Sequence, residues 1–193
     1  MKILLALTFS FYSVALFSQE TSGIEYSLAG VFNWDMFRGK INQRHIAEMG
    51  PNTGAVTVSS LSYKTIHIQG KTIKIKISAE FNPLESWTRY PKLEHPEEAL
   101  NHEKRHFDIC EIYARKIRQV VSQAHLNTWN FNGELDFLFK KLVKEYHAEQ
   151  ARYDRETNHS MDAAQQKKWN TAIDAQLKTL SDYSSPIVTV TLN

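Results

Sequence analysis

The run from His102 to His106 (HEKRH) has the residue types and spacing with the clearest chemical meaning in the chain. Two histidines four positions apart on a helix project from one face, about one turn apart, and can hold the same metal ion. A carboxylate beside the first histidine can take a proton from a water on that ion. We therefore expect His102 and His106 to be metal ligands and Glu103 to be a general base.

Zinc, one ion per chain, is the cofactor that this pattern favours. Neutral imidazoles leave zinc enough Lewis acidity to lower the pKa of a bound water toward ~7 and to polarise a carbonyl group. The alternative is a pair of exposed histidines on a charged helix. In helical projection, however, His102 and His106 continue the apolar stripe that includes Ile109, so we expect both to face the interior.

The third ligand must come from another part of the chain. Cys110 extends the four-residue spacing, but it lies about 12 Å along the helix from His102, so we expect it to pack in the core. The segment 149–159 (EQARYDRETNH) offers three suitable side chains, Asp154, Glu156 and His159. The residue types alone leave all three open.

The elements that must position these residues begin with strands. Three β-favouring runs precede the histidines, at 54–63, 65–69 and 72–81, and the last of them alternates Ile with Lys. They predict a three-stranded antiparallel meander. The final β-favouring run, 186–192, should return to this sheet, because a free apolar edge would aggregate.

Helices should fill the second half of the chain. Pro96, followed by two acidic residues, favours a helix start, and the pattern predicts helices over 96–125, 134–156 and 162–180. Strands first and helices later predict an α+β fold in which HEKRH lies on a long helix.

The first residues predict export. Met1 and Lys2 precede an uncharged apolar run from Ile3 to Phe17, which is typical of a secretory signal peptide cleaved after Ser18. This run of roughly 15 residues is shorter than the ~20 that cross a bilayer, so we expect no stable membrane insertion after cleavage. Residues 19–193 should form one domain, located in the periplasm or outside the cell.

Composition excludes some partners. The formal net charge is +2, and loss of Lys2 with the signal peptide leaves +1, which is too small to favour nucleic acid. The single cysteine cannot form an internal disulfide, so stability must come from packing or from metal.

Several stretches together resemble a bacterial family of predicted secreted zinc-dependent proteases. They are WDMFRG from Trp34, Ser86-Trp87, LNHEKRHF from Leu100 and YDRETNH from Tyr153, and they span most of the chain after residue 18. The resemblance implies a zincin-like arrangement and zinc-dependent cleavage of amide bonds. The last motif of that family usually continues with Gly, where Ser160 stands in this chain.

With that motif in place, we prefer His159 as the third ligand. A histidine just past a helix end can swing toward the ion, and Asp154 is the alternative ligand or an orienting partner of an imidazole. Arg38 and Tyr153 are candidates to stabilise a transition-state oxyanion. The aromatic residues Trp34, Phe37, Trp87 and Trp129 are more often core than cleft residues.

The predicted function is therefore a secreted or periplasmic zinc metallopeptidase acting on a peptide or peptidoglycan-like substrate, which a sheet edge could hold by strand addition. The alternative is a non-catalytic exported envelope or binding protein with a structural zinc. Glu103 favours catalysis, because a structural site gains nothing from a carboxylate at that position.

Overall fold

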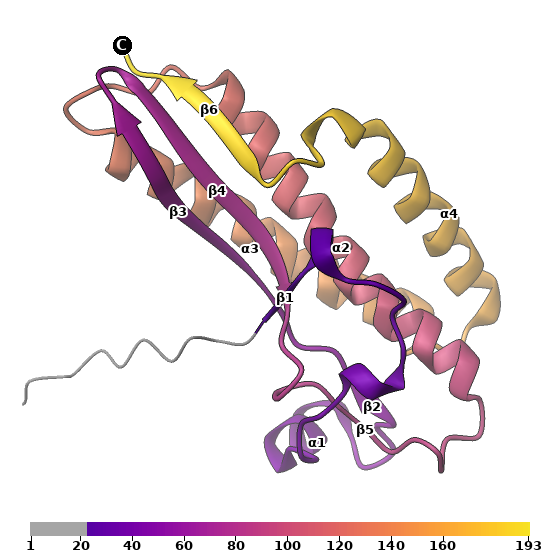
Figure 1. The fold of residues 1–193 in the computed structure, drawn as a ribbon. Coiled ribbons are helices and arrows are strands. Elements are labelled where there is room, and N and C mark those ends of the chain that lie inside the picture. The colour runs from indigo at the N-terminus through magenta and orange to yellow at the C-terminus, as the bar shows by residue number, and fades with distance from the viewer. Residues whose placement is uncertain (1–22) are drawn as a thin grey trace, which may run out of the picture.

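A computed structural model describes residues 23–193, so the expected signal peptide at residues 1–18 lies outside the described residues. In chain order the elements are β1 (Ile24–Glu25), η1 (Tyr26–Leu28), η2 (Trp34–Met36), α1 (Gln43–Met49), β2 (Ala55–Val56), β3 (Ser59–Gln69), β4 (Thr72–Phe81), β5 (Trp87–Thr88), α2 (Pro96–Gln123), α3 (Phe131–Thr157), α4 (Ala163–Thr179), η3 (Ser181–Tyr183) and β6 (Ile187–Thr191). The α+β prediction is confirmed (Figure 1).

Strand β4 is the centre of the main sheet. It pairs with β3 along one side, while β1 and β6 share its other side, all antiparallel. Its isoleucines Ile73, Ile75 and Ile77 are fully buried, because alternate residues of a strand point to the same face. The predicted return of the C-terminal strand is confirmed, with Val188 opposite Ile75.

The predicted three-stranded meander is wrong in its strand count. The runs 54–63 and 65–69 contribute to one strand, β3, which carries a register irregularity between Thr65 and His67. The residue between the two runs is Lys64, so no Gly or Pro ends the strand there, and a bulge absorbs the extra residue. The first residues of the predicted strand form β2, which pairs with β5 in a separate two-stranded sheet.

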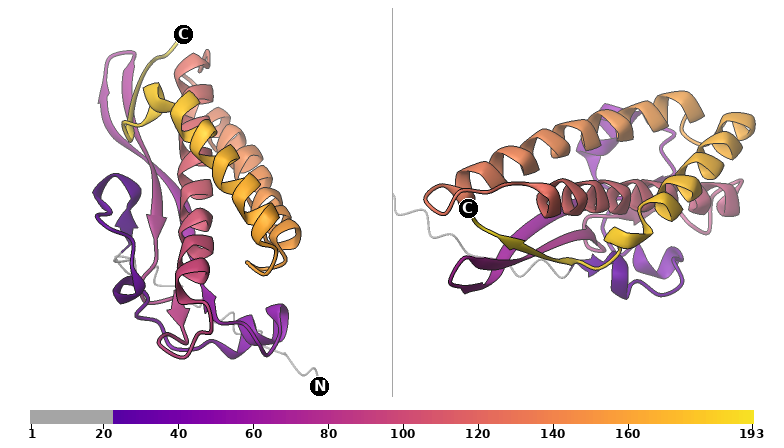
Figure 2. Two further views of the ribbon diagram at one scale, coloured as in Figure 1. Left: turned by 90° about the vertical axis from the view of Figure 1, so that its right-hand side faces the viewer. Right: turned by 90° about the horizontal axis from the view of Figure 1, so that it is seen from above.

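Helix α2 lies between the main sheet on one side and α3 and α4 on the other (Figure 2). It begins with Pro96 in its first turn, where the missing N–H costs no hydrogen bond, and Glu97 and Glu98 favour its positive end. Because neighbours cover it on both sides, the middle of α2 is buried almost continuously, from Phe107 to Ala114. The predicted helix ranges differ from the observed ones by at most three residues.

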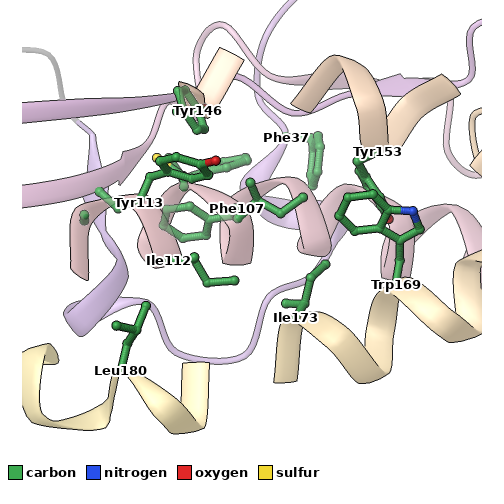
Figure 3. Packing of buried hydrophobic residues seen from close by; sticks show 14 residues of the cluster. Phe37, Phe107, Ile112, Tyr113, Tyr146, Tyr153, Trp169, Ile173 and Leu180 are labelled. Atoms are coloured by element: carbon green, nitrogen blue, oxygen red, sulfur yellow. The ribbon is translucent and has the colours of Figure 1, made fainter. Parts of the chain in front are cut away.

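Aromatic residues fill the core around the middle of α2. Phe107 and Tyr113 pack with Tyr153 of α3 and with Trp169 and Ile173 of α4 (Figure 3). A second cluster, toward the C-terminal end of α2, joins this helix to the isoleucines of β4 and to α3. Among residues 23–193, no helix combines the length and the apolar character needed to cross a membrane.

Of the four aromatic residues singled out in the sequence, Trp87 and Phe37 are buried, as expected for core residues, and Trp34 packs against the core. Trp129 is 83% exposed in the turn between α2 and α3. It therefore contributes little to either a core or a cleft.

Candidate metal centre

Three potential ligand atoms converge where α2 faces α3. Nε2 of His102 lies 3.2 Å from Nε2 of His106 and 3.2 Å from Oδ1 of Asp154, and Nε2 of His106 lies 2.9 Å from the same oxygen. Ligand atoms at ~2.0–2.1 Å from zinc in tetrahedral geometry lie ~3.3 Å from one another. The triangle therefore matches one face of a zinc coordination tetrahedron.

Helix geometry and antiparallel packing produce this convergence. The four-residue spacing puts His102 and His106 on one face of α2, with ring centroids 4.8 Å apart. The short connection between α2 and α3 sets the start of α2 against the end of α3, where Asp154 lies. The ring of Tyr153 stacks on His102 at 4.6 Å and 19°, which fixes the imidazole plane.

Glu103 has a different environment from Asp154. Its side chain is buried, with 6% exposure, and it lines the same cleft as the two histidines. Its Oε2 has no hydrogen-bond partner within residues 23–193, although buried carboxylate oxygens almost always have one. An acceptor is therefore available next to the histidine pair.

The electrostatics of the cluster follow from burial and from the charge of Asp154. Burial alone would lower the pKa of His106, but the hydrogen bond and the charge of Asp154 outweigh burial and raise that pKa to about 9. Burial would raise the pKa of Asp154, and the two imidazoles reverse this and hold it well below its usual range. The cluster thus attracts a positive charge, either a proton or a metal ion.

His159 lies at the rim of the cluster. Its Nδ1 is 3.7 Å from Oδ1 of Asp154, and its side chain is 54% exposed. Asn158, His159 and Ser160 all have positive φ, at 48°, 50° and 71°. Gly, which the resemblance leads us to expect at position 160, would adopt this left-handed conformation without strain, whereas Ser160 adopts it here. Within residues 23–193, the side chain that converges with the two histidines is therefore Asp154, the alternative third ligand from the sequence, and not His159, the preferred one.

Two other candidates from the sequence lie outside the cluster. Glu156 accepts a hydrogen bond from Nε1 of Trp169 at 3.0 Å. Cys110 is fully buried, and burial raises the pKa of its thiol to about 12, so a thiolate is strongly disfavoured there. Cys110 therefore packs in the core, and Glu156 is an exposed residue bonded to α4.

Neither oxyanion candidate reaches the cleft. Tyr153 is fully buried, and its hydroxyl lies 3.2 Å from the carbonyl oxygen of His102 and 2.8 Å from Nε2 of Gln166. Arg38 is exposed in the segment after η2 and does not line the cleft. The structure therefore gives no support to an oxyanion role for these two residues.

The cleft at the cluster has a volume of about 790 Å³. Its walls are the segment 50–59, the start of α2, the second half of α3 and the turn at 158–161. Six of the eight histidines of the chain line it: His45, His95, His102, His106, His147 and His159. His45, His95 and His147 have no partner at ligand spacing in the sequence, so only the tertiary fold brings them to the cleft.

Fold and site together define an α+β protein with a His–His–Asp cluster between two antiparallel helices, in which His102 is buried and His106 and Asp154 are partly buried. Over residues 71–160 the chain matches the model of a family described as bacterial proteins of unknown function (DUF922). The matched range is slightly less than half of the 193 residues, and it includes the three cluster residues. No curated protein and no solved structure matches the chain.

Proposed function

We propose that this protein is a zinc-dependent hydrolase, most concretely a metallopeptidase, in which His102, His106 and Asp154 hold the ion. The observation that carries the proposal is the convergence of two imidazole nitrogens and one carboxylate oxygen near Oε2 of Glu103, which has no hydrogen-bond partner within residues 23–193. When bound, zinc would lower the pKa of a water and polarise a substrate carbonyl.

Glu103 is the proton acceptor in this proposal. Its Oε2 is buried and has no partner among the described residues, so a water proton can be transferred to it without breaking an existing bond. The carboxylic acid formed in this way can return the proton to the leaving amine. Asp154 is unsuited to this role, because the two imidazoles engage its Oδ1.

The outer edge of β2, which has no pairing strand within residues 23–193 and lines the cleft, supports a polypeptide substrate. The hydrogen bond from the Arg89 N–H to the Gly54 carbonyl, together with the β2–β5 register, makes Gly54 and Val56 the residues bonded to β5. By alternation, the N–H and C=O of Ala55 and Thr57 face away from β5. An extended peptide could pair with them, and Thr57 is anchored to α2 by a 3.1 Å hydrogen bond to the Glu103 carbonyl.

A structural zinc site is the second candidate, and His159 favours it. This residue stands 3.7 Å from Asp154, close enough for a small turn movement to make it a fourth protein ligand. An ion with four protein ligands would hold α2 and α3 together without catalysing a reaction. Oε2 of Glu103, which has no partner among the described residues, argues for a catalytic site, because a purely structural site has no use for it.

The N-terminal sequence supports export. We propose that Met1–Ser18 is a cleaved signal peptide and that the protein acts in the periplasm or outside the cell. N-terminal sequencing of the protein purified from the cell envelope fraction should begin at Gln19. Recovery of the intact Met1 terminus from the cytoplasm would contradict the proposal.

The hydrolase proposal is tested by incubating the zinc-loaded protein with an unfolded polypeptide and identifying new termini by mass spectrometry. We expect cleavage by wild type and none by Glu103→Gln carrying equal zinc. Zinc binding without cleavage of any polypeptide, in both proteins alike, would favour the structural site.

A further inference from the structure

Each of the two histidines of the cluster is held by a glutamine from a different helix. Nδ1 of His106 lies 2.6 Å from Oε1 of Gln150 on α3, and Nδ1 of His102 lies 3.0 Å from Oε1 of Gln166 on α4. Gln166 is 7% exposed and Gln150 is partly buried. Both contacts use the ring nitrogen that faces away from the cluster.

The orientation of the Gln150 amide follows from its second contact. Nε2 of Gln150 donates to the backbone carbonyl of His106 at 2.9 Å, and a carbonyl oxygen can only accept. The other end of the amide, Oε1, must therefore face Nδ1 of His106. Because Oε1 can only accept, this Nδ1 carries the proton when the ring is neutral, and Nε2 keeps its lone pair for the cluster.

A longer chain of contacts orients Gln166 in the same way. The guanidinium of Arg105, which can only donate, bonds Oδ1 of Asn170 at 3.2 Å. That oxygen accepts a second bond from Nε2 of Gln166 at 2.9 Å. Oε1 of Gln166 is thereby directed to Nδ1 of His102, so Nε2 of His102 also keeps its lone pair for the cluster.

The partners are neutral amides, whereas metal-bound histidines are often backed by carboxylates. A carboxylate would make the imidazole a stronger electron donor and would add negative charge around the ion. With amides, formal negative charge at the cluster comes from Asp154 and Glu103. The Lewis acidity of the ion is then preserved.

We infer that Gln150 and Gln166 are positioning residues that fix both imidazoles in the tautomer that binds metal through Nε2. Arg105 of α2 and Asn170 of α4 contribute by orienting the amide of Gln166. The inference rests on the proposed zinc site. It assigns a role to α4, which lies outside the residues 71–160 matched by the family model.

The test is the zinc dissociation constant, measured by competition with a chromophoric chelator, for Gln150→Met and Gln166→Met. Methionine keeps the length of the side chain and removes the acceptor. We expect each variant to bind zinc about 10–100-fold more weakly than wild type, and Gln150→Glu and Gln166→Glu to bind at least as tightly as wild type. Gln123→Met, at the far end of α2, is the matched control and should bind like wild type.

Thermal unfolding of the metal-free variants shows which of them are folded. Zinc dissociation constants are then compared among the folded variants, so that an effect on positioning is distinguished from an effect on folding. Wild-type affinity in both folded methionine variants would overturn the inference and leave the zinc site intact. Weaker binding in the glutamate variants than in the methionine variants would also overturn it. Absence of zinc binding by wild type would overturn the proposed function and this inference together.

Discussion

Two acidic residues near the same histidines, the buried Glu103 and the partly buried Asp154, have different partners. Oδ1 of Asp154 contacts Nε2 of both His102 and His106, so its charge is engaged within the cluster. Oε2 of Glu103 is buried without a partner among residues 23–193. The first environment suits a metal ligand and the second suits a proton acceptor, which is how we assign the two carboxylates.

Glu103→Gln should lower the turnover number by about 10²–10⁴-fold, because the amide cannot accept the proton. Zinc affinity should stay close to that of wild type, since Glu103 is not among the three convergent ligands. Steady-state kinetics and chelator competition measure the two effects. Glu98→Gln, an exposed change on the same helix, is the control, and equal losses in both variants would refute a specific role for Glu103.

Zinc affinity should rise with pH up to about 9. The pKa of His106 is raised from 6.5 to about 9 by Asp154, so a proton occupies the cluster of the metal-free protein below that pH and must leave when zinc binds. Near pH 7.5 the apparent affinity should increase about tenfold per pH unit. A constant affinity between pH 6.5 and 8.5 would contradict this competition.

The same shifts predict how the stability of the metal-free protein depends on pH. The raised pKa of His106 contributes stability that is complete below 6.5 and is lost as pH rises through about 9. The lowered pKa of Asp154 contributes stability that is present above 3.8 and is lost as pH falls. Both contributions are present between about pH 4 and 6.5. Urea denaturation should show this range, and Asp154→Ala should remove the dependence.

At the scale of elements, a buried arginine that is ion-paired within α2 also bonds this helix to the sheet. Arg118 is 2% exposed and donates to both carboxylate oxygens of Glu111 and to the Ile77 carbonyl of β4. It also bonds the carbonyl of Tyr183, close to the start of β6. Helix, central strand and C-terminal segment therefore meet at one guanidinium group.

Arg118→Met should lower the free energy of unfolding by about 3–5 kcal/mol, because it leaves Glu111 buried with one charged partner fewer. Urea denaturation measures the change. Lys140→Met, which removes an exposed pair with Asp136, is the control and should change stability little. An equal loss in the free energy of unfolding for the two substitutions would show that the buried pair stabilises the fold no more than the exposed pair does.

The sequence predicted the helices better than the strands. Helix starts depend on local signals such as Pro96, whereas the pairing of β2 with β5 and the continuous β3 depend on contacts between distant segments. In the site, the helical spacing placed His102 and His106 correctly relative to each other. The roles of Gln150 and Gln166 were not predictable, because their partners are set only by how α3 and α4 pack on α2.

At the scale of the whole molecule, the cluster bridges α2 and α3 but lies apart from the second apolar core. That core joins Ile73, Ile117 and Leu135, all fully buried, at the other end of the helices. The fold should therefore persist without metal, and metal should add stability by binding the native state alone.

Removal of zinc with a chelator should lower the midpoint of thermal unfolding and leave the far-ultraviolet circular dichroism spectrum largely unchanged. Free zinc at about 1,000 times its dissociation constant adds about 4 kcal/mol to the free energy of unfolding. Asp154→Ala should show little of this gain. Collapse of the helical signal on metal removal would instead indicate that the ion is required for folding.

The central claim is that His102, His106 and Asp154 hold one zinc ion. Its most direct test is elemental analysis of the purified protein, comparing wild type with Asp154→Ala and His159→Ala. We predict about one zinc per chain in wild type and in His159→Ala, and almost none in Asp154→Ala. Zinc retained without Asp154 but lost without His159 would move the third ligand to His159, and a metal-free wild type would contradict the zinc site itself.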